Sequence, residues 1–301
     1  MRIIELVVLL LMCVHLISCT SNEQAPGAAS GINAQGISNK DITIKILPET
    51  PTVLTDLQTI LTGLDNYTYQ WEKNGEIIKG ENTERLSKDK FAKDDKITVK
   101  AIAGAKTISA SVVIANSRPI VTAVSLSPQY VVHGTDITAT PTGFDADGDF
   151  VRFNYRWLVN GQEVSRDATL KGNKFKRGDV VELEVVAYDN DGEGEVFRGI
   201  PLTIPNAPPK FISVSLTTSS ENTYTYSVRA EDADGDKLTY SITDPPKGMV
   251  IDAATGQITW QIAAREDAGK HDVEIVVQDE KGLKTSQKYT MEVTIPEEGQ
   301  K

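Results

Sequence analysis

Residues 181–187 read Val-Glu-Leu-Glu-Val-Val-Ala, and the alternation of apolar and charged side chains in this stretch decides the fold class. Successive side chains of a β-strand point to opposite faces, so the pattern predicts a half-buried strand in an antiparallel sheet. Residues 97–101, Ile-Thr-Val-Lys-Ala, alternate in the same way. Glycines and prolines, 22 and 13 in number, punctuate such segments. The 301 residues are therefore expected to form two or three β domains of about 100–150 residues each.

An internal repeat surrounds these strands. Residues 69–75, YQWEKNG, recur as residues 155–161, YRWLVNG, and a TGLD segment at 62–65 recurs as TGFD at 142–145. Both Asn-Gly pairs predict type I′ hairpin turns, which need positive φ at two successive residues. Trp71 and Trp157 precede these turns and are predicted to fill sandwich cores, with ligand stacking as the alternative. The repeat offset grows from 80 to 86 residues at the acidic segment 145–150, so that insertion should be a loop.

A third unit differs from the two repeat copies. It carries EDADGD at 231–236, GMVID at 248–252, TGQITW at 255–260 and VEIVVQD at 273–279. These motifs resemble the cadherin-like Ig repeat of bacterial surface proteins, and the first two units resemble the Ig-like, PKD-like repeats of bacterial envelope proteins. The resemblance implies seven-stranded β-sandwiches and, for the third unit, extracellular binding or adhesion with calcium at its loops.

Similar junctions separate the units. Residues 114–119, IANSRP, match residues 204–209, IPNAPP, and the strand-like segments VSLS at 124–127 and VSLT at 214–217 follow them. Prolines fix φ, so both linkers should be stiff. The prediction is three tandem Ig-like β-sandwich domains after a signal peptide and a flexible tether. The expected boundaries are 41–117, 118–206 with the acidic loops, and 207–296 for the cadherin-like domain, followed by a disordered tail at 297–301.

The N-terminus predicts an address in the cell envelope. Residues 1–18 combine a basic start, an apolar run and a small-residue end, which is typical of a signal peptide, whereas the run is short for a transmembrane helix. The segment Leu-Ile-Ser-Cys at 16–19 resembles the lipobox of bacterial lipoproteins, which implies cleavage before Cys19 and lipidation of that residue. An ordinary cleavage site beside a chance cysteine is the alternative. Thr20 follows Cys19, and by resemblance to lipoprotein sorting this favours the outer membrane over the inner. Residues 19–40 should be a flexible tether.

Three acidic segments, at 145–149, 189–195 and 232–236, offer the chain's chemistry. They are not EF-hands, because the twelfth position of each holds Arg156, Ile200 or Thr243 instead of an acid. In an Ig-like sandwich the loops after the second and sixth strands meet at one end, so distant carboxylates should converge there. A calcium ion would relieve their repulsion, whereas the alternative is a set of solvated Asp-Gly turns. The candidate ligands are Asn116, Asp145, Asp147, Asp149, Asp189, Asp191, Asn206, Asp232, Asp234, Asp236 and Asp279. The first unit lacks such segments and should bind no calcium.

Charge and motifs narrow the function. The net charge of −11, without clusters of Lys and Arg, argues against nucleic acid as a partner. No nucleophile elbow, zinc-protease or phosphate-loop motif is present, and His133 and His271 are isolated. We therefore expect a non-enzymatic, lipid-anchored envelope protein for adhesion, binding or spacing, with structural Ca²⁺. The alternatives are a periplasmic scaffold or assembly subunit of an envelope complex, and a carbohydrate-binding accessory protein. The protein or glycan partner is not specified.

Overall fold

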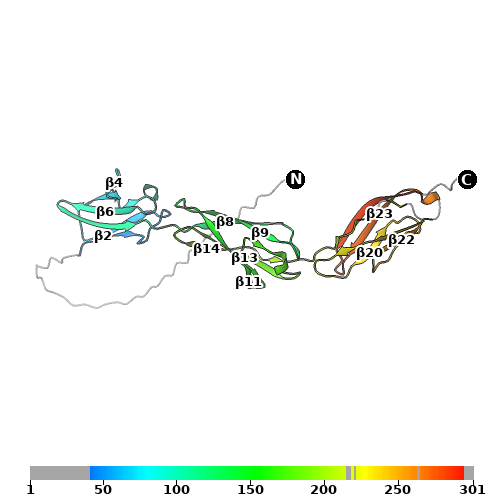
Figure 1. Ribbon diagram of the computed structural model, residues 1–301. Helices are drawn as coiled ribbons and strands as arrows, with labels where there is room; N and C mark the ends of the chain where they lie inside the picture. Colours follow the sequence, from blue (N-terminus) through cyan, green and yellow to red (C-terminus); the bar gives the residue numbers. More distant parts are fainter. Residues whose placement is uncertain (1–40, 215–217, 220–221, 263–264, 295–301) are drawn as a thin grey trace, which may run out of the picture. The chain divides into compact units, whose positions relative to one another are not determined.

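The structure is a computed structural model that describes residues 41–214, 218–219, 222–262 and 265–294. The predicted signal peptide, Cys19, the tether and the tail at 297–301 lie outside these residues. Strands account for nearly all of the regular structure, and Figure 1 shows them labelled along the chain. Within the described part of the chain, no helix has the length and apolar character needed to cross a bilayer. The prediction of an all-β fold is confirmed.

The first sandwich consists of two antiparallel sheets. Its strands number seven, as expected for an Ig-like fold. One sheet has the order β1 (Thr43–Leu47), β2 (Leu57–Thr62), β5 (Arg85–Leu86), and the other has the order β4 (Glu76–Ile77), β3 (Thr68–Lys73), β6 (Lys96–Ala103), β7 (Lys106–Val113). A short 3-10 turn, η1 (Lys88–Lys90), lies between β5 and β6.

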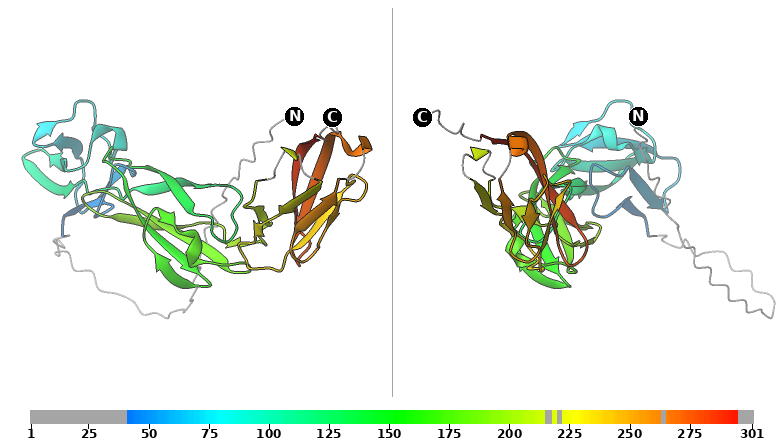
Figure 2. Two further views of the ribbon diagram at one scale, coloured as in Figure 1. Left: turned by 45° about the vertical axis from the view of Figure 1, so that its right-hand side comes forward. Right: turned by 90° about the vertical axis from the view of Figure 1, so that its right-hand side faces the viewer.

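The second sandwich repeats this arrangement. Figure 2 shows its strands in green. Its final strand is split, because residues 199–201 interrupt the pairing with β13. One sheet has the order β12 (Thr169–Leu170), β9 (Ile137–Phe144), β8 (Ile120–Ser127). The other has the order β11 (Gln162–Ser165), β10 (Arg152–Val159), β13 (Val180–Tyr188), β14 (Glu193–Arg198), and β15 (Leu202–Thr203) also pairs with β13. The short 3-10 turn η2 (Gly172–Lys174) lies between β12 and β13.

The described residues of the third sandwich form nine strand segments, from two to ten residues long. One sheet has the order β17 (Thr218–Ser219), β24 (Lys284–Val293), β23 (Gly269–Gln278), β20 (Thr239–Thr243). A second sheet has the order β18 (Thr223–Ser227), β22 (Gln257–Gln261), β21 (Val250–Ile251). In addition, β16 (Lys210–Phe211) pairs with β19 (Ala230–Glu231), and the short 3-10 turn η3 (Arg265–Asp267) precedes β23.

Of the strand-like segment expected at 214–217, only Val214 lies within the described residues, and its side chain is exposed. The described strand β16 ends before it, at Phe211. The N–H groups of Ile212 and Ser213 both donate to the Arg229 carbonyl, so the regular ladder stops there. The Ser213 hydroxyl then accepts the N–H of Arg229, which holds this segment by a side chain instead of by strand pairing.

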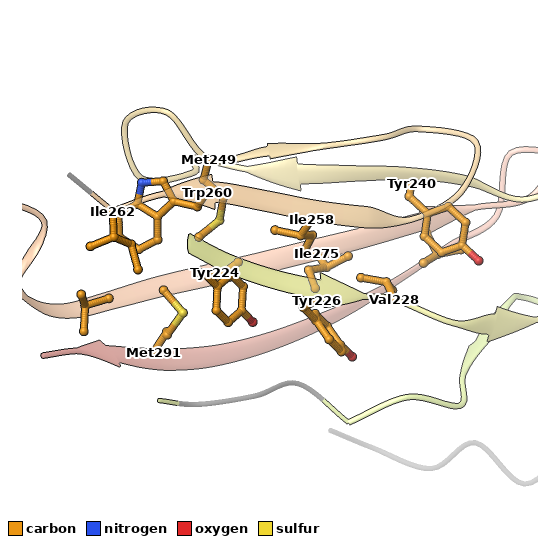
Figure 3. Packing of buried hydrophobic residues seen from close by; sticks show 13 residues of the cluster. Tyr224, Tyr226, Val228, Tyr240, Met249, Ile258, Trp260, Ile262, Ile275 and Met291 are labelled. Carbon is orange, nitrogen blue, oxygen red and sulfur yellow. The ribbon is translucent and has the colours of Figure 1, made fainter. Parts of the chain in front are cut away.

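Each sandwich has its own buried core, formed by the inward faces of both of its sheets. In β13, Val181, Leu183, Val185 and Ala187 are buried, as their alternation with polar residues predicted. Figure 3 shows the third core, where Trp260 and Tyr224 belong to the packed cluster. The cores do not merge, so each sandwich buries its apolar surface separately.

The repeat predicted from the sequence holds at the level of single bonds. Trp71 and Trp157 are fully buried, and their indole Nε1 atoms each donate to a backbone carbonyl at 2.9 Å. Asn74 and Asn160 open turns in which both central residues have positive φ, as a type I′ turn requires. The side-chain amide of each asparagine donates to an aspartate, Asp95 or Asp179. Its side-chain oxygen accepts the backbone N–H of the residue after that aspartate. The core and turn predictions are confirmed.

Candidate cation sites at the sandwich junctions

Two linkers meet the acidic loops of the sandwich that follows each of them. We call residues 114–119, together with the loops 145–149 and 189–192, the first junction. Residues 204–209, together with the loop 232–236 and Asp279, form the second junction. The loop 145–149 follows β9 and the loop 189–192 follows β13, whereas 232–236 follows β19 and Asp279 follows β23. Loops from two strand ends therefore meet each linker, as the sequence predicted.

Each acidic loop is shaped by its first aspartate. Asp145 Oδ1 accepts the N–H groups of Asp147 and Asp149, at 2.8 and 3.1 Å. Asp232 Oδ1 accepts those of Asp234 and Asp236 at 2.9 and 3.2 Å. These bonds consume one oxygen of the first aspartate and curl the loop, which is the usual role of Asp in a turn. The other carboxylates of the loop are thereby brought close together.

At the first junction the linker binds both loops. Asn116 Nδ2 donates to Asp189 Oδ2 at 2.9 Å. The next residue, Ser117, donates its N–H to Asp147 Oδ2 at 2.5 Å. The linker also lies close to β14, where a Cβ added at Gly194 would come within 1.8 Å of the Pro119 carbonyl oxygen. Only glycine fits there, so the linker is held against the second sandwich along its length.

The second junction repeats the pattern. Asn206 Nδ2 donates to Asp279 Oδ2 at 2.7 Å, and the Ala207 N–H donates to Asp234 Oδ2 at 2.8 Å. Asp279 Oδ1 also accepts the N–H groups of Lys281 and Leu283, both at 2.9 Å. The linker asparagines that we selected from the sequence therefore lie against the carboxylates expected to be near them.

Hydrogen bonding adjusts the protonation of one buried carboxyl. Burial works to raise the pKa of Asp189, but the hydrogen bond from Asn116 and those from the N–H groups of Asp191 and Gly192 outweigh it. The pKa of Asp189 is therefore held below its ordinary value, and the group is ionised at neutral pH. A buried negative charge is thus part of the first junction.

Several oxygens at the junctions have no partner, and this is the test of whether a metal would fit. Asp145 is only 7% exposed, and its Oδ2 makes no hydrogen bond. Three further buried side-chain oxygens also make no hydrogen bond: Asn116 Oδ1, Asp232 Oδ2 and Asp234 Oδ1. Ligand oxygens of Asp145, Asp147 and Asp149 lie within 4.8 Å of one another. Unsatisfied buried acceptors are costly, and hard oxygens so arranged are the donors that Ca²⁺ prefers. The residues present fit the ion, and calcium binding stays a prediction.

Two basic residues at the junctions were missed by the sequence analysis. The Lys93 ammonium contacts Asp149 at 2.6 Å and also contacts Asp191. The Arg177 guanidinium contacts both oxygens of Asp236. The internal repeat could have indicated them, because Lys93 and Arg177 each lie two residues after a buried phenylalanine at matching positions of the two copies.

The two described histidines differ in position. His133 Nδ1 lies 3.8 Å from Asp234 Oδ1, so this residue belongs to the second junction and is not an isolated surface group. His271 packs edge-on against Trp260, and its Nε2 contacts the Asp267 carbonyl at 2.8 Å. His271 therefore packs against a residue of the third core.

One family model matches the third sandwich. Residues 207–294 match the family described as "Putative Ig domain". The comparison with curated protein sequences gave no match. Among solved structures, the chain is similar to three N-terminal domains of the Hoc outer capsid protein of bacteriophage RB49, with 15% identity, 86% of this chain and 99% of that chain covered, and a TM-score of 0.28.

A cadherin and a desmocollin are among the other similar structures. Mouse cadherin-23 EC22–24 is 19% identical, with 85% of this chain and 100% of that chain covered and a TM-score of 0.28. The human desmocollin-1 ectodomain is 12% identical, with 85% and 62% covered and a TM-score of 0.31. Similarity at this level carries no argument about ligands or partners. The class of molecule is set by the strands and by the matched domain: a chain with tandem Ig-like β-sandwiches.

Proposed function

We propose that this protein is a non-enzymatic, lipid-anchored envelope protein in which Ca²⁺ at the junctions holds Ig-like sandwiches as a binding or spacing module. The single observation that carries the calcium part is the buried Oδ2 of Asp145, which has no hydrogen-bond partner although the ligand oxygens of Asp147 and Asp149 lie close to it in the same loop. A buried acceptor oxygen without a donor is stabilised by a cation.

The role of such an ion follows from which segments it would join. The linker residues Asn116 and Ser117 already hydrogen-bond to the two acidic loops, through Asp189 and Asp147. An ion bound by Asp145 and its neighbours would neutralise the loops while they keep these bonds. Bending at the linker breaks the same bonds, so calcium would resist bending. Anchoring by lipid at Cys19 would place this module on a membrane.

The test is a calorimetric titration of the purified protein with CaCl₂, followed by thermal unfolding with and without calcium. Binding to the folded state alone stabilises it by about 2.7 kcal/mol at a hundredfold excess over Kd. We expect Ca²⁺ to raise the melting temperature and Mg²⁺ to do so poorly, because Mg²⁺ needs a tight octahedron and dehydrates reluctantly.

The chain supplies a matched control for this experiment. Asp65 in the first sandwich is the repeat counterpart of Asp145, but it is exposed and has no acidic insertion after it. Asp145→Asn should weaken calcium binding by at least about tenfold, since it removes one charged ligand, and Asp65→Asn should leave it unchanged. Equal effects of the two substitutions, or no calcium-specific heat in the parent protein, would remove calcium from the proposal.

A further inference from the structure

The two junctions already contain a cation of their own. Lys93 and Arg177 belong to the sandwich before each junction, and each reaches the acidic loops of the sandwich after it. They follow the buried residues Phe91 and Phe175, which end the turns η1 and η2. The repeat therefore places a basic side chain at the same point twice, although the residue type differs.

Arg177 contacts two of the candidate ligands of the second junction, whereas Asp232 Oδ2 and Asp234 Oδ1 have no hydrogen-bond partner. Its Nη2 donates to Asp236 Oδ1 at 3.0 Å, while its Nη1 contacts the other oxygen of Asp236 and also the side-chain oxygen of Asn206. The same Nη1 lies 3.6 Å from Asp234 Oδ2. The Asp236 side chain is only 4% exposed. A guanidinium is planar, permanently charged and matched to a carboxylate by two parallel bonds, so it fills this position well.

Lys93 contacts the more exposed carboxylates of the first junction. Its contacts are Asp149 and Asp191, whose side chains are 38% and 49% exposed. The Asn116 oxygen, equivalent to the Asn206 oxygen that Arg177 contacts, has no partner, and neither has Asp145 Oδ2. A lysine is a single flexible point charge, and an exposed pair contributes little to stability. Lys93 thus leaves the Asn116 oxygen available to a metal, whereas Arg177 occupies the equivalent oxygen of Asn206.

Formal charge does not separate the junctions. The first has five aspartates, in the loops 145–149 and 189–192, against Lys93 and the linker residue Arg118, and the second has four, in 232–236 and at 279, against Arg177. The arrangement of the acids does separate them. Among the residues that the structure describes, the group of three acids with converging ligand atoms is the one in 145–149. Arg177 also holds the pKa of the Asp236 carboxyl below its ordinary value, which agrees with a persistent ion pair.

We infer that the two junctions are neutralised by different cations: calcium at the first, and the Arg177 side chain in place of calcium at the second. The inference rests on the proposed calcium function and sets its stoichiometry. It also reverses the expectation from family resemblance, which implied calcium at the third unit. The second junction would then resist bending without calcium, and the first would depend on calcium concentration.

The experiment is a calcium titration of the purified full chain in four forms: parent, Arg177→Met, Arg177→Gln and Arg198→Met. Arg198 is the matched control, because it pairs with Glu184 on an exposed sheet face away from both junctions. We expect one tight site in the parent and in Arg198→Met. Both Arg177 variants should gain a second site, with affinity raised at least about tenfold over any second site of the parent.

Assignment of each site uses a second substitution. Adding Asp147→Asn should remove the parent's tight site and leave the site gained by Arg177→Met, whereas adding Asp234→Asn should remove the gained site only. Thermal unfolding in EDTA shows whether each variant is folded. Because methionine and glutamine differ in polarity, one Arg177 variant can replace the other if only one of them folds.

The outcomes separate the two proposals. Two sites of matched affinity in the parent, unchanged by Arg177→Met, would overturn the inference while leaving calcium stiffening in place. A parent without calcium binding whose Arg177 variants gain a site would support the exclusion of calcium by Arg177 but overturn calcium at the first junction. A complete absence of calcium binding in all four forms would overturn both.

Discussion

Asn116 donates its side-chain amide to Asp189 Oδ2 at 2.9 Å, and so a linker residue provides a hydrogen bond to a buried carboxylate of the following sandwich. The pair Asn206 and Asp279 repeats this relationship at 2.7 Å. Each asparagine lies 73 residues before its aspartate, and the repeated spacing indicates that the bond belongs to the design of the junction. The linkers are therefore part of the folded structure and not passive connections.

Removing this bond should destabilise the second sandwich. Asn116→Ala leaves a buried, ionised Asp189 with one donor fewer, which we expect to cost about 1–3 kcal/mol. Urea unfolding of the purified chain in EDTA measures it. Asn154→Ala is the matched control, since Asn154 donates to Glu193 at 3.2 Å on an exposed surface and should cost no more than about 0.5 kcal/mol. Equal costs for the two variants would show that the linker bond does not hold the loop.

The indoles should be the anchors of the cores. Trp71→Ala and Trp157→Ala each empty a fully buried site and remove a hydrogen bond to a backbone carbonyl, so we expect a cost of about 3–5 kcal/mol for the sandwich concerned. Calorimetric unfolding of the whole chain should show one transition shifted in each variant. Tyr130→Ala serves as the control, because the Tyr130 side chain is exposed. A loss no larger than that of Tyr130→Ala would contradict a core role.

The strands and turns could be predicted because their determinants are local. The alternation along residues 181–187 places one face inward whatever the neighbours are, and it matches the burial of β13. The Asn-Gly pairs at 74–75 and 160–161 adopt positive φ because few other residue pairs do so at low cost. The convergence of loops 145–149 and 189–192 followed from the order of strands in an Ig-like sandwich.

The basic residues of the junctions could not be found in this way. Lys93 and Arg177 stand in polar turns where the sequence shows only solvated charge, and their partners lie 56 and 59 residues away. Such pairing depends on contact between successive sandwiches, for which no local pattern exists.

Membrane attachment should depend on Cys19. We expect Cys19→Ala to release the protein from the membrane fraction of cells, because several acyl chains at about 0.8 kcal/mol per buried CH₂ hold a lipoprotein stably and their loss leaves no such anchor. Cell fractionation followed by immunodetection measures the distribution. Ser18→Ala, which keeps a small residue before the cysteine, is the control and should stay membrane-bound. Retention of the Cys19→Ala protein would contradict the lipoprotein interpretation.

Acid should weaken the junctions before it affects the cores. The pKa of Asp236 is lowered chiefly by the hydrogen bonds from Arg177, and the pKa of Asp189 is lowered because hydrogen bonds outweigh the opposing effect of burial. A group whose pKa is lower in the folded state binds fewer protons there than in the unfolded state, so it stabilises the fold above its unfolded pKa, about 3.9 for Asp. That contribution is lost as the pH falls through the lower, folded-state value.

Stability in EDTA should therefore be nearly constant from about pH 5 to 7 as far as these two groups are concerned, and should fall steadily below about pH 4. Urea unfolding at successive pH values measures it. In Arg177→Met the pKa of Asp236 should return towards its ordinary value, so the acid-induced loss should become smaller than in the parent protein, whereas Arg198→Met should retain the parent's slope. A parent whose stability rises as the pH falls from 5 to 3 would contradict the assignment, because a raised and not a lowered folded-state pKa would then dominate the junctions.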